Sequence, residues 1–149
     1  MRHTIQTEVT IDAAPDVVWR ALTDLERYGE WNPFVVSARG RVAVGEQLVN
    51  RLEPPGGRAM TFKPTVTEAE PARTFEWLGR LVVPGLFDGR HRFELEPTAG
   101  GGTRLVHSEQ FSGLLVRAMR RSLDTTTLAG FTAMNEALRD RVEASTTQG

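Results

Sequence analysis

The sequence predicts an α+β fold in which a curved antiparallel sheet of seven strands wraps around a long C-terminal helix. The first observation is a change of hydrophobic period, from two in the opening residues to that of a helix after residue 12. The second is a succession of strand-like runs between residues 34 and 112, joined by short connections rich in glycine and proline. The third is a helical pattern that returns at residue 114. Connections this short favour antiparallel neighbours, because parallel strands need long crossovers.

One strand and two short helices are expected at the N-terminus. Residues 3–11 alternate between apolar and polar side chains, which is typical of a half-buried strand. The next segment reads APDVVWRALTDLERY, and Pro15 occupies a favourable first position in a helix. The helical pattern ends in GEWNPF, because Pro33 disfavours helical backbone at Asn32.

The rest of the chain is expected to form the remaining strands and the long helix. The strand-like runs cover residues 34–43, 46–53, 58–69, 74–83, 86–97 and 102–112. From residue 114 to about 143, apolar side chains recur every three or four positions, which predicts one long amphipathic helix. The tail from about residue 144 is expected to fray.

Composition limits the classes of function. A chain of 149 residues is expected to form one domain over residues 1–149. With 18 basic and 19 acidic residues the net charge is −1, so we expect no nucleic-acid partner. The chain has no cysteine, hence no disulfide and no thiolate chemistry, and no apolar run long enough for a signal peptide or membrane span. We expect a cytoplasmic monomer or homodimer without integral membrane association.

Three titratable side chains share one face of the last predicted hairpin. His91 lies on its first strand, and His107 and Glu109 lie on its second, among apolar neighbours of the same parity. The opposite face of the first strand carries four charged side chains, Arg90, Arg92, Glu94 and Glu96. Burying four charges in the interior would be prohibitively costly. The face that holds the two histidines is therefore expected to point inward.

The pairing register decides which of these groups lie opposite each other. If Thr103 pairs with Pro97, Glu109 faces His91, whereas a slip of two residues sets His107 opposite His91. The three side chains remain neighbours in both registers. Polar groups on an apolar concave face need hydrogen bonds or water, which a pocket supplies more readily than a dry core.

Three interpretations of this cluster stay open. His91 and His107 could act as general acid and base while Glu109 orients one imidazole, which suits proton transfer on a carbonyl-bearing ligand. The cluster could equally be a structural polar network. Two histidines and a carboxylate could also bind zinc or non-haem iron, but their spacing resembles no metal motif, so we expect no metal.

Several segments resemble a known superfamily. They read VTIDAAPDVVWRALTDLERYGEWNPF, FEWLGRL and HRFELEPTAGGGTRLVHSEQFSGLL, and they precede a long helix. In this order they resemble the START-like helix-grip (SRPBCC) superfamily, which includes polyketide cyclase/dehydrase-like proteins, lipid-transport proteins and the pollen-allergen fold. The resemblance covers nearly the whole chain. It implies a cavity for a hydrophobic ligand between sheet and long helix, with no obligatory cofactor.

The resemblance leaves several classes of function open. The first is binding of a small hydrophobic ligand, such as an aromatic polyketide-like compound, a lipid or an acyl compound. The alternative is a cyclase or dehydratase that uses His91, His107 and Glu109 for acid/base chemistry. A further alternative is a co-chaperone-like protein-interaction domain, which requires a sizeable exposed apolar patch.

The candidate ligand-binding residues combine inward parity with apolar or aromatic side chains, and each could instead be ordinary core. Two carry amides, and Asn32 could bind a ligand or cap a turn. The loop at residues 83–89 is interpreted as a pocket entrance or a plain hairpin turn. The full set is Trp31, Asn32, Phe34, Asn50, Met60, Phe62, Phe75, Trp77, Phe93, Phe111, Met119, Leu123, Phe131 and Met134.

A small basic cluster lies near the start of the long helix. Arg117, Arg120 and Arg121 are interpreted as a solvated face that could also contact a partner or a lipid phosphate. Three arginines are too few to indicate a nucleic-acid site.

Overall fold

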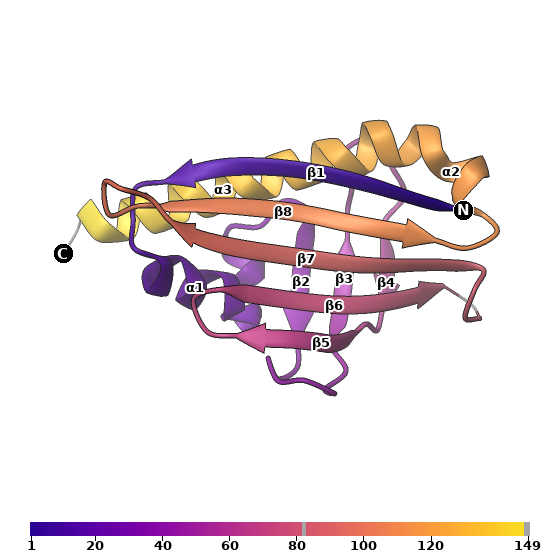
Figure 1. The fold of residues 1–149 in the computed structure, drawn as a ribbon, viewed down its shortest axis with the longest axis horizontal. Helices are drawn as coiled ribbons and strands as arrows, with labels where there is room; N and C mark the ends of the chain where they lie inside the picture. The colour runs from indigo at the N-terminus through magenta and orange to yellow at the C-terminus, as the bar shows by residue number, and fades with distance from the viewer. Residues whose placement is uncertain (82, 148–149) are drawn as a thin grey trace.

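The principal sheet is antiparallel and carries most of the hydrogen-bonded pairing. The computed structural model describes residues 1–81 and 83–147. Its five-stranded sheet has the order β1-β8-β7-β6-β5. The strands in that order are β1 (Arg2–Ile11), β8 (Thr103–Ser112), β7 (Phe87–Pro97), β6 (Thr74–Leu81) and β5 (Thr65–Glu70) (Figure 1).

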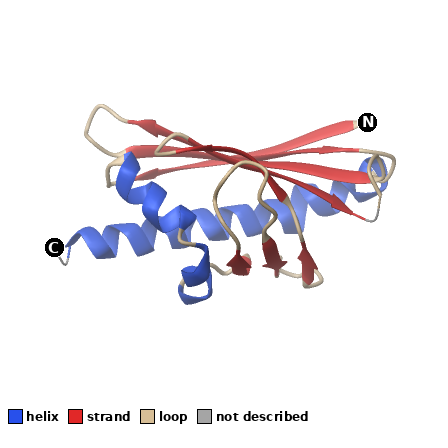
Figure 2. Ribbon diagram, turned by 90° about the horizontal axis from the view of Figure 1, so that it is seen from below, coloured by secondary structure: helices blue, strands red, loops and turns tan. Residues whose placement is uncertain are grey.

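A smaller sheet and the helices complete the fold. The three-stranded sheet is formed by β2 (Val35–Arg39), β3 (Val49–Leu52) and β4 (Met60–Phe62). Helix α1 (Pro15–Thr23) and a 3₁₀ helix (Leu25–Glu30) follow β1, as expected. The C-terminal helical region comprises α2 (Val116–Ser122), a π-helical turn (Leu123–Thr127) and α3 (Leu128–Thr147). Figure 2 shows this region running along one face of the large sheet.

The core lies between the inner face of the large sheet and the helices. The rings of Phe34 and Phe131 meet edge to face, with centroids 5.6 Å apart, and so join the start of β2 to α3. Phe93 is fully buried on β7, and Val18 and Leu22 of α1 are equally inaccessible. Full burial of each such side chain contributes roughly 1.5–3 kcal/mol. An α+β arrangement of sheet around helix therefore follows from the apolar faces that the sequence defines.

The expected number of strands is wrong, because the run at residues 58–69 forms two strands instead of one. Pro64 separates β4 from β5, and its missing N–H cannot continue the ladder. Its carbonyl instead accepts a hydrogen bond from the backbone N–H of Leu48, 2.8 Å away. Since residues 49–52 pair with β4, the chain moves from one sheet to the other at this point. The result is eight strands in two sheets.

The C-terminal helix also departs from the expected pattern. It begins at Val116 and contains a π-helical turn, in which Thr125 Oγ1 donates to the carbonyl of Arg121 at 2.8 Å. Helix α3 ends at Thr147, four residues beyond the end expected at about residue 143. Ser145 donates its hydroxyl proton to the Val142 carbonyl at 2.7 Å and so satisfies an acceptor in the last turns. Residues 148–149 lie outside the described residues.

Among the described helices, none combines the length and the hydropathy required to cross a membrane.

Gly130 of α3 provides a test of how tightly the helix packs on β2. A Cβ atom at this position would overlap the ring of Phe34. We expect Gly130→Ala to lower the free energy of unfolding by about 1–3 kcal/mol through overpacking, despite alanine's advantage of about 1 kcal/mol in a helix. Denaturant unfolding measures the change.

Gly100→Ala is the matched control, because a Cβ atom there meets open space and the backbone is not left-handed. This variant should be neutral or stabilised by up to about 1 kcal/mol. Equal stability of the two variants would contradict close packing of α3 on Phe34.

Candidate functional site

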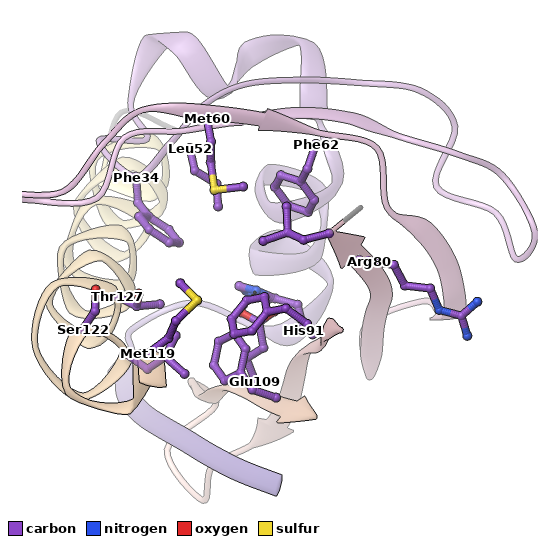
Figure 3. A pocket seen from close by; sticks show the side chains of 16 residues that line it. Phe34, Leu52, Met60, Phe62, Arg80, His91, Glu109, Met119, Ser122 and Thr127 are labelled. Carbon is purple, nitrogen blue, oxygen red and sulfur yellow. Dashed lines mark hydrogen bonds and ion pairs between the residues drawn. The ribbon is translucent and has the colours of Figure 1, made fainter. Parts of the chain in front are cut away.

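A partly open cavity of about 130 Å³ lies between the large sheet, the small sheet and the helical region. Its wall is mostly apolar, and His91 and Glu109 bring polar groups to it from β7 and β8 (Figure 3). Arg80 contributes to the rim, but Figure 3 shows its guanidinium pointing away from the cavity. The space therefore suits a small, largely apolar molecule with limited polar contact.

The structure separates the candidate residues into wall and core. Those that line the cavity are Phe34, Met60, Phe62, Phe111, Met119, Leu123, His91 and Glu109. Those that lie outside its wall are Trp31, Asn32, Asn50, Phe75, Trp77, Phe93, Phe131, Met134 and His107. Both groups have inward parity. Alternation along a strand identifies the face that points inward, but it does not show whether a residue there lies in the core or at the cavity wall.

Two examples show what the residues outside the wall do. Trp31 packs edge to face on Tyr28, with ring centroids 5.2 Å apart. Asn32 Oδ1 accepts hydrogen bonds from the backbone N–H groups of Phe34 and Val35, at 3.0 and 2.9 Å. Asn32 therefore holds the turn that leads into β2, which is the cap that the sequence left as one of two interpretations.

Part of the cavity wall lies outside the set of candidate residues. The lining residues that the candidate set lacks are Leu52, Gly79, Arg80, Leu81, Phe87, Gly89, Ser122 and Thr127. Phe87 and Gly89 could have been found from their position, because they lie on the same face of β7 as His91, at intervals of two residues. The sequence assigns both residues to the strand run 86–97 and also to the loop 83–89, and the structure places them in β7, which begins at Phe87.

Two glycines create the space for the cavity. Gly79 of β6 and Gly89 of β7 are opposite each other in the ladder. The ring of Phe62 lies 3.2 Å from the position that a Cβ of Gly79 would occupy, and a Cβ of Gly89 would overlap Glu109 Oε2. Without side chains at these two positions, the aromatic ring and the carboxyl group can approach the sheet backbone.

The β7–β8 register confirms one of the two expected pairings. Thr103 lies opposite Pro97, and Glu109 lies opposite His91. His107 is opposite Phe93 and has no exposed surface, while His91 is 3% exposed. The face with the histidines therefore points inward, as the cost of burying the charged face predicts.

A continuous chain of hydrogen bonds starts at the cavity. Glu109 Oε1 lies 3.0 Å from His91 Nδ1, and the Nε2 atoms of His91 and His107 are 2.6 Å apart. His107 Nδ1 lies 2.8 Å from Asn135 Oδ1 on α3. Asn135 Nδ2 donates to Thr7 Oγ1 on β1 at 2.7 Å. The chain thus runs from the cavity wall across the sheet and ties the sheet to the long helix.

The far end of this chain determines which ring nitrogen of His107 carries the proton. Thr7 donates its hydroxyl proton to the carbonyl of His107 at 3.3 Å and accepts from the Asn135 amide nitrogen. The Asn135 oxygen must then accept from His107 Nδ1–H. A neutral His107 accepts at Nε2, so His91 donates from its own Nε2. Because burial lowers the pKa of His91 to about 3, its Nδ1 carries no proton near neutral pH and accepts. Glu109 is left as the donor, which makes it a neutral carboxylic acid.

Burial favours the neutral forms of all three titratable side chains. It raises the pKa of Glu109 from 4.5 to about 8 and lowers the pKa of His91 from 6.5 to about 3. The pKa of His107 falls well below 6.5, first through burial and then through His91, against the opposing hydrogen bond to Asn135. Near neutral pH the network therefore holds neutral imidazoles and a protonated carboxyl group.

Ring packing keeps His107 away from the cavity. Its imidazole is stacked on Phe131 with centroids 4.1 Å apart and an interplanar angle of 4°, and it stacks on Phe93 at 4.4 Å. Trp77 stacks on His91 at 4.6 Å. Of the residues in the hydrogen-bond chain, only His91 and Glu109 line the cavity. The side chain of Glu109 retains 15% exposure.

The carboxyl group of Glu109 has one oxygen available for a ligand. Oε1 belongs to the hydrogen bond with His91, whereas Oε2 makes no hydrogen bond with any group of the described residues. Since the carboxyl proton points toward His91, Oε2 offers a lone pair, and so an acceptor, to the cavity. The described residues contain no cluster of three or more His, Asp or Glu side chains arranged to hold a metal ion.

The raised pKa of Glu109 predicts an unusual pH dependence of stability. Between its ordinary pKa of 4.5 and about 8, the folded state binds a proton that the unfolded state lacks, so this contribution weakens as pH rises. The depressed pKa values of the histidines act oppositely, and only below their ordinary value of 6.5. We expect the free energy of unfolding to fall by up to about 1.4 kcal/mol per pH unit above pH 6.5, until about pH 8.

Chemical denaturation across this pH range measures the effect. Glu109→Gln is the matched variant, because its amide N–H can still donate to His91 Nδ1 but does not titrate. The variant should lose the decline above pH 6.5. An equal decline in both proteins would show that another group is responsible.

Comparison with known proteins agrees with the fold. The structure resembles the Zhui aromatase/cyclase from Streptomyces sp. R1128, with a TM-score of 0.78 and 17% identity over 96% of this chain and 94% of that one. Protein MLL2253 from Mesorhizobium loti matches with a TM-score of 0.73 and 24% identity over 96% and 98% of the two chains. A Thalictrum flavum norcoclaurine synthase matches with a TM-score of 0.75 and 14% identity over 98% and 97%.

These identities establish the shared fold alone, and no curated protein matches by sequence. The family model described as polyketide cyclase / dehydrase and lipid transport, however, matches residues 2–143. This match confirms the superfamily that the sequence segments indicated, and the chain belongs to the polyketide cyclase/dehydrase and lipid transport family.

Proposed function

We propose that the protein binds a small, largely apolar molecule whose hydroxyl group, a phenol or an enol, donates a hydrogen bond to Glu109 Oε2. The observation that carries the proposal is a neutral carboxyl group in the wall of an otherwise apolar cavity, with one oxygen unused. Oε2 has no hydrogen-bond partner among the described residues, and a ligand hydroxyl that donates to it contributes about 1 kcal/mol net. Family membership supports a ligand-binding or cyclase-type role.

The size of the cavity limits the ligand. A dry cavity of about 150 Å³ accommodates benzene, and the volume here is about 130 Å³. One six-membered ring therefore fits inside, and a longer molecule extends through the open side. Met60 and Met119 form part of the wall, and their flexible side chains can adapt to substituents on the ring.

Acid/base catalysis is the second candidate, favoured by the direction of the hydrogen-bond chain. Oε2 can remove a proton from a carbon next to a ligand carbonyl while the Oε1 proton moves to His91 Nδ1. The resulting enolate can close a ring or expel a β-hydroxyl group. In the second case the proton on Oε2 leaves with the hydroxyl as water, and His91 returns its proton to Oε1.

The roles in this mechanism differ from those expected from the sequence. Glu109 exchanges protons with the ligand, and His91 holds a proton during the reaction. His107 and Asn135 are positioning residues, because they set the tautomer of His91 and do not line the cavity. The transient imidazolium is disfavoured by burial, which returns the proton to Glu109.

Binding is tested with p-cresol and toluene, which differ in one hydroxyl group. The protein should bind p-cresol about fivefold more tightly, the value of a net hydrogen bond of about 1 kcal/mol. Glu109→Leu should abolish this preference, and Glu109→Gln should keep it, because the amide oxygen remains an acceptor. Isothermal titration calorimetry measures both affinities.

Met119→Trp, which fills the cavity, should abolish binding of both compounds. Binding of toluene and p-cresol with equal affinity to wild type would contradict the role of Glu109. Failure of both to bind the correctly folded wild type would contradict the cavity as a binding site.

Catalysis is tested with 4-hydroxy-4-phenylbutan-2-one, which loses water to form a conjugated enone followed by absorbance. Glu109→Gln should reduce the rate about 100- to 10,000-fold, the usual contribution of a positioned acid/base group. Glu96→Gln, an exposed position on the opposite face of the same hairpin, should leave the rate unchanged. If wild type binds p-cresol but does not dehydrate this compound above the Glu109→Gln rate, the catalytic candidate fails and the binding proposal stands.

Asn135→Leu tests the positioning role. It removes the acceptor of His107 Nδ1–H, so the tautomer of His91 is no longer specified. The pH–rate profile should shift, a change that simple loss of stability does not produce. An unshifted profile with reduced amplitude would assign Asn135 to stability alone.

A further inference from the structure

Exposed apolar side chains gather at one end of the molecule. Among the described residues, Leu114 is 84% exposed, Met1 58%, Val83 52% and Leu115 41%. The remaining large exposed apolar residue, Val44, lies elsewhere, before β3. Figure 1 shows the N-terminus, the β6–β7 connection and the start of α2 meeting at the same end.

Backbone hydrogen bonds hold these segments together. The N–H of Gly113 donates to the carbonyl of Met1 at 3.3 Å, and that of Leu114 donates to Gly85 at 3.2 Å. Gly85 and Gly113 have φ angles of 87° and 122°, a left-handed backbone that makes both turns tight. Leu114 therefore projects from a braced turn, and the surface is a set of protruding tips and not a groove.

Arginines without ionic partners surround these tips. They are exposed and make no ion pair with any described residue: Arg2, Arg80, Arg117, Arg120 and Arg121. Elsewhere arginines are generally paired, as in the contacts of Arg104 with Glu8 and with Glu96. Arg39, on β2, is an exposed arginine of the same unpaired kind at another site.

Acidic residues do not neutralise this end. The two carboxylates of these segments, Asp88 and Asp124, are fewer than the five arginines, and they contact the Gly85 N–H at 3.1 Å and His3 at 2.6 Å. Glu109 faces the cavity as a neutral acid. The end is therefore positively charged, although the whole chain has a net charge of −1. The same segments contribute Leu81, Phe87 and Met119 to the cavity wall.

We propose that this end of the molecule docks on the surface of a bilayer that contains anionic lipids. The projecting apolar side chains enter the interfacial region, and the arginines contact lipid phosphates. A deformable apolar phase accommodates protruding tips, whereas a protein partner would need a matching concave surface. The proposal goes beyond ligand binding and depends only on the surface, so it stands whether or not the cavity binds phenols.

Sedimentation with vesicles tests the proposal. The protein should bind vesicles of equimolar phosphatidylglycerol and phosphatidylcholine, bind weakly to pure phosphatidylcholine, and dissociate when the salt concentration rises. Each basic residue near such a surface contributes about fivefold in partition. The triple variant Arg117→Gln, Arg120→Gln and Arg121→Gln should therefore bind about 100-fold more weakly.

Matched variants separate the possible causes. Arg39→Gln removes an unpaired, exposed arginine from another face and should leave binding unchanged, while Arg120→Gln should lower it about fivefold. Leu114→Ser should weaken binding about tenfold through lost apolar burial. Glu109→Gln should bind vesicles like wild type, which separates docking from the function of the cavity.

Three outcomes would overturn the proposal. The first is no binding to the anionic vesicles at low salt. The second is equal loss of binding in Arg39→Gln and Arg120→Gln, which would indicate unspecific attraction. The third is binding of a soluble acidic protein through the same arginines without any vesicle binding, which would assign the surface to a protein partner.

Discussion

The hydrogen bond from His107 to Asn135 is the interaction on which the site depends. It joins the centre of the sheet to the long helix, and through Thr7 it specifies the tautomers of both buried histidines. A buried polar network is stable only when each member has a partner, and this one is satisfied from β1 to the cavity wall. The protonated state of Glu109 follows from these tautomers together with the burial that keeps His91 neutral.

Close packing and open space are produced by the same strands. Stacked rings of Trp77, Phe93 and Phe131 cover the imidazoles, and the facing glycines Gly79 and Gly89 leave the gap beside them. The aromatic layer lowers the local dielectric and raises the cost of charge. A ligand in the gap would therefore contact the protonated carboxyl group of Glu109, whereas the same group would be ionised in water.

Charge is distributed differently on the two sides of the molecule's surface. On the outer face of the large sheet, Glu76 accepts from Arg90 and Arg92, each at 2.8 Å, so opposite charges pair along the strands. Near the start of α2, arginines lack such partners. Exposed ion pairs contribute little to stability, so their absence costs the fold little and leaves charge free for an interaction.

Local patterns in the sequence determined the α+β class, the two short helices, the long helix and the inward face of the last hairpin. Period-two alternation and the cost of burying charges such as Arg92 are sufficient for these features. Only the tertiary structure decided that Pro64 splits a strand, that Gly79 lies opposite Gly89, and that Asn135 reaches His107 from α3. Proton positions depend on contacts between residues distant in the chain, which no local pattern contains, and for that reason the roles of Glu109 and the histidines could not be read from the sequence.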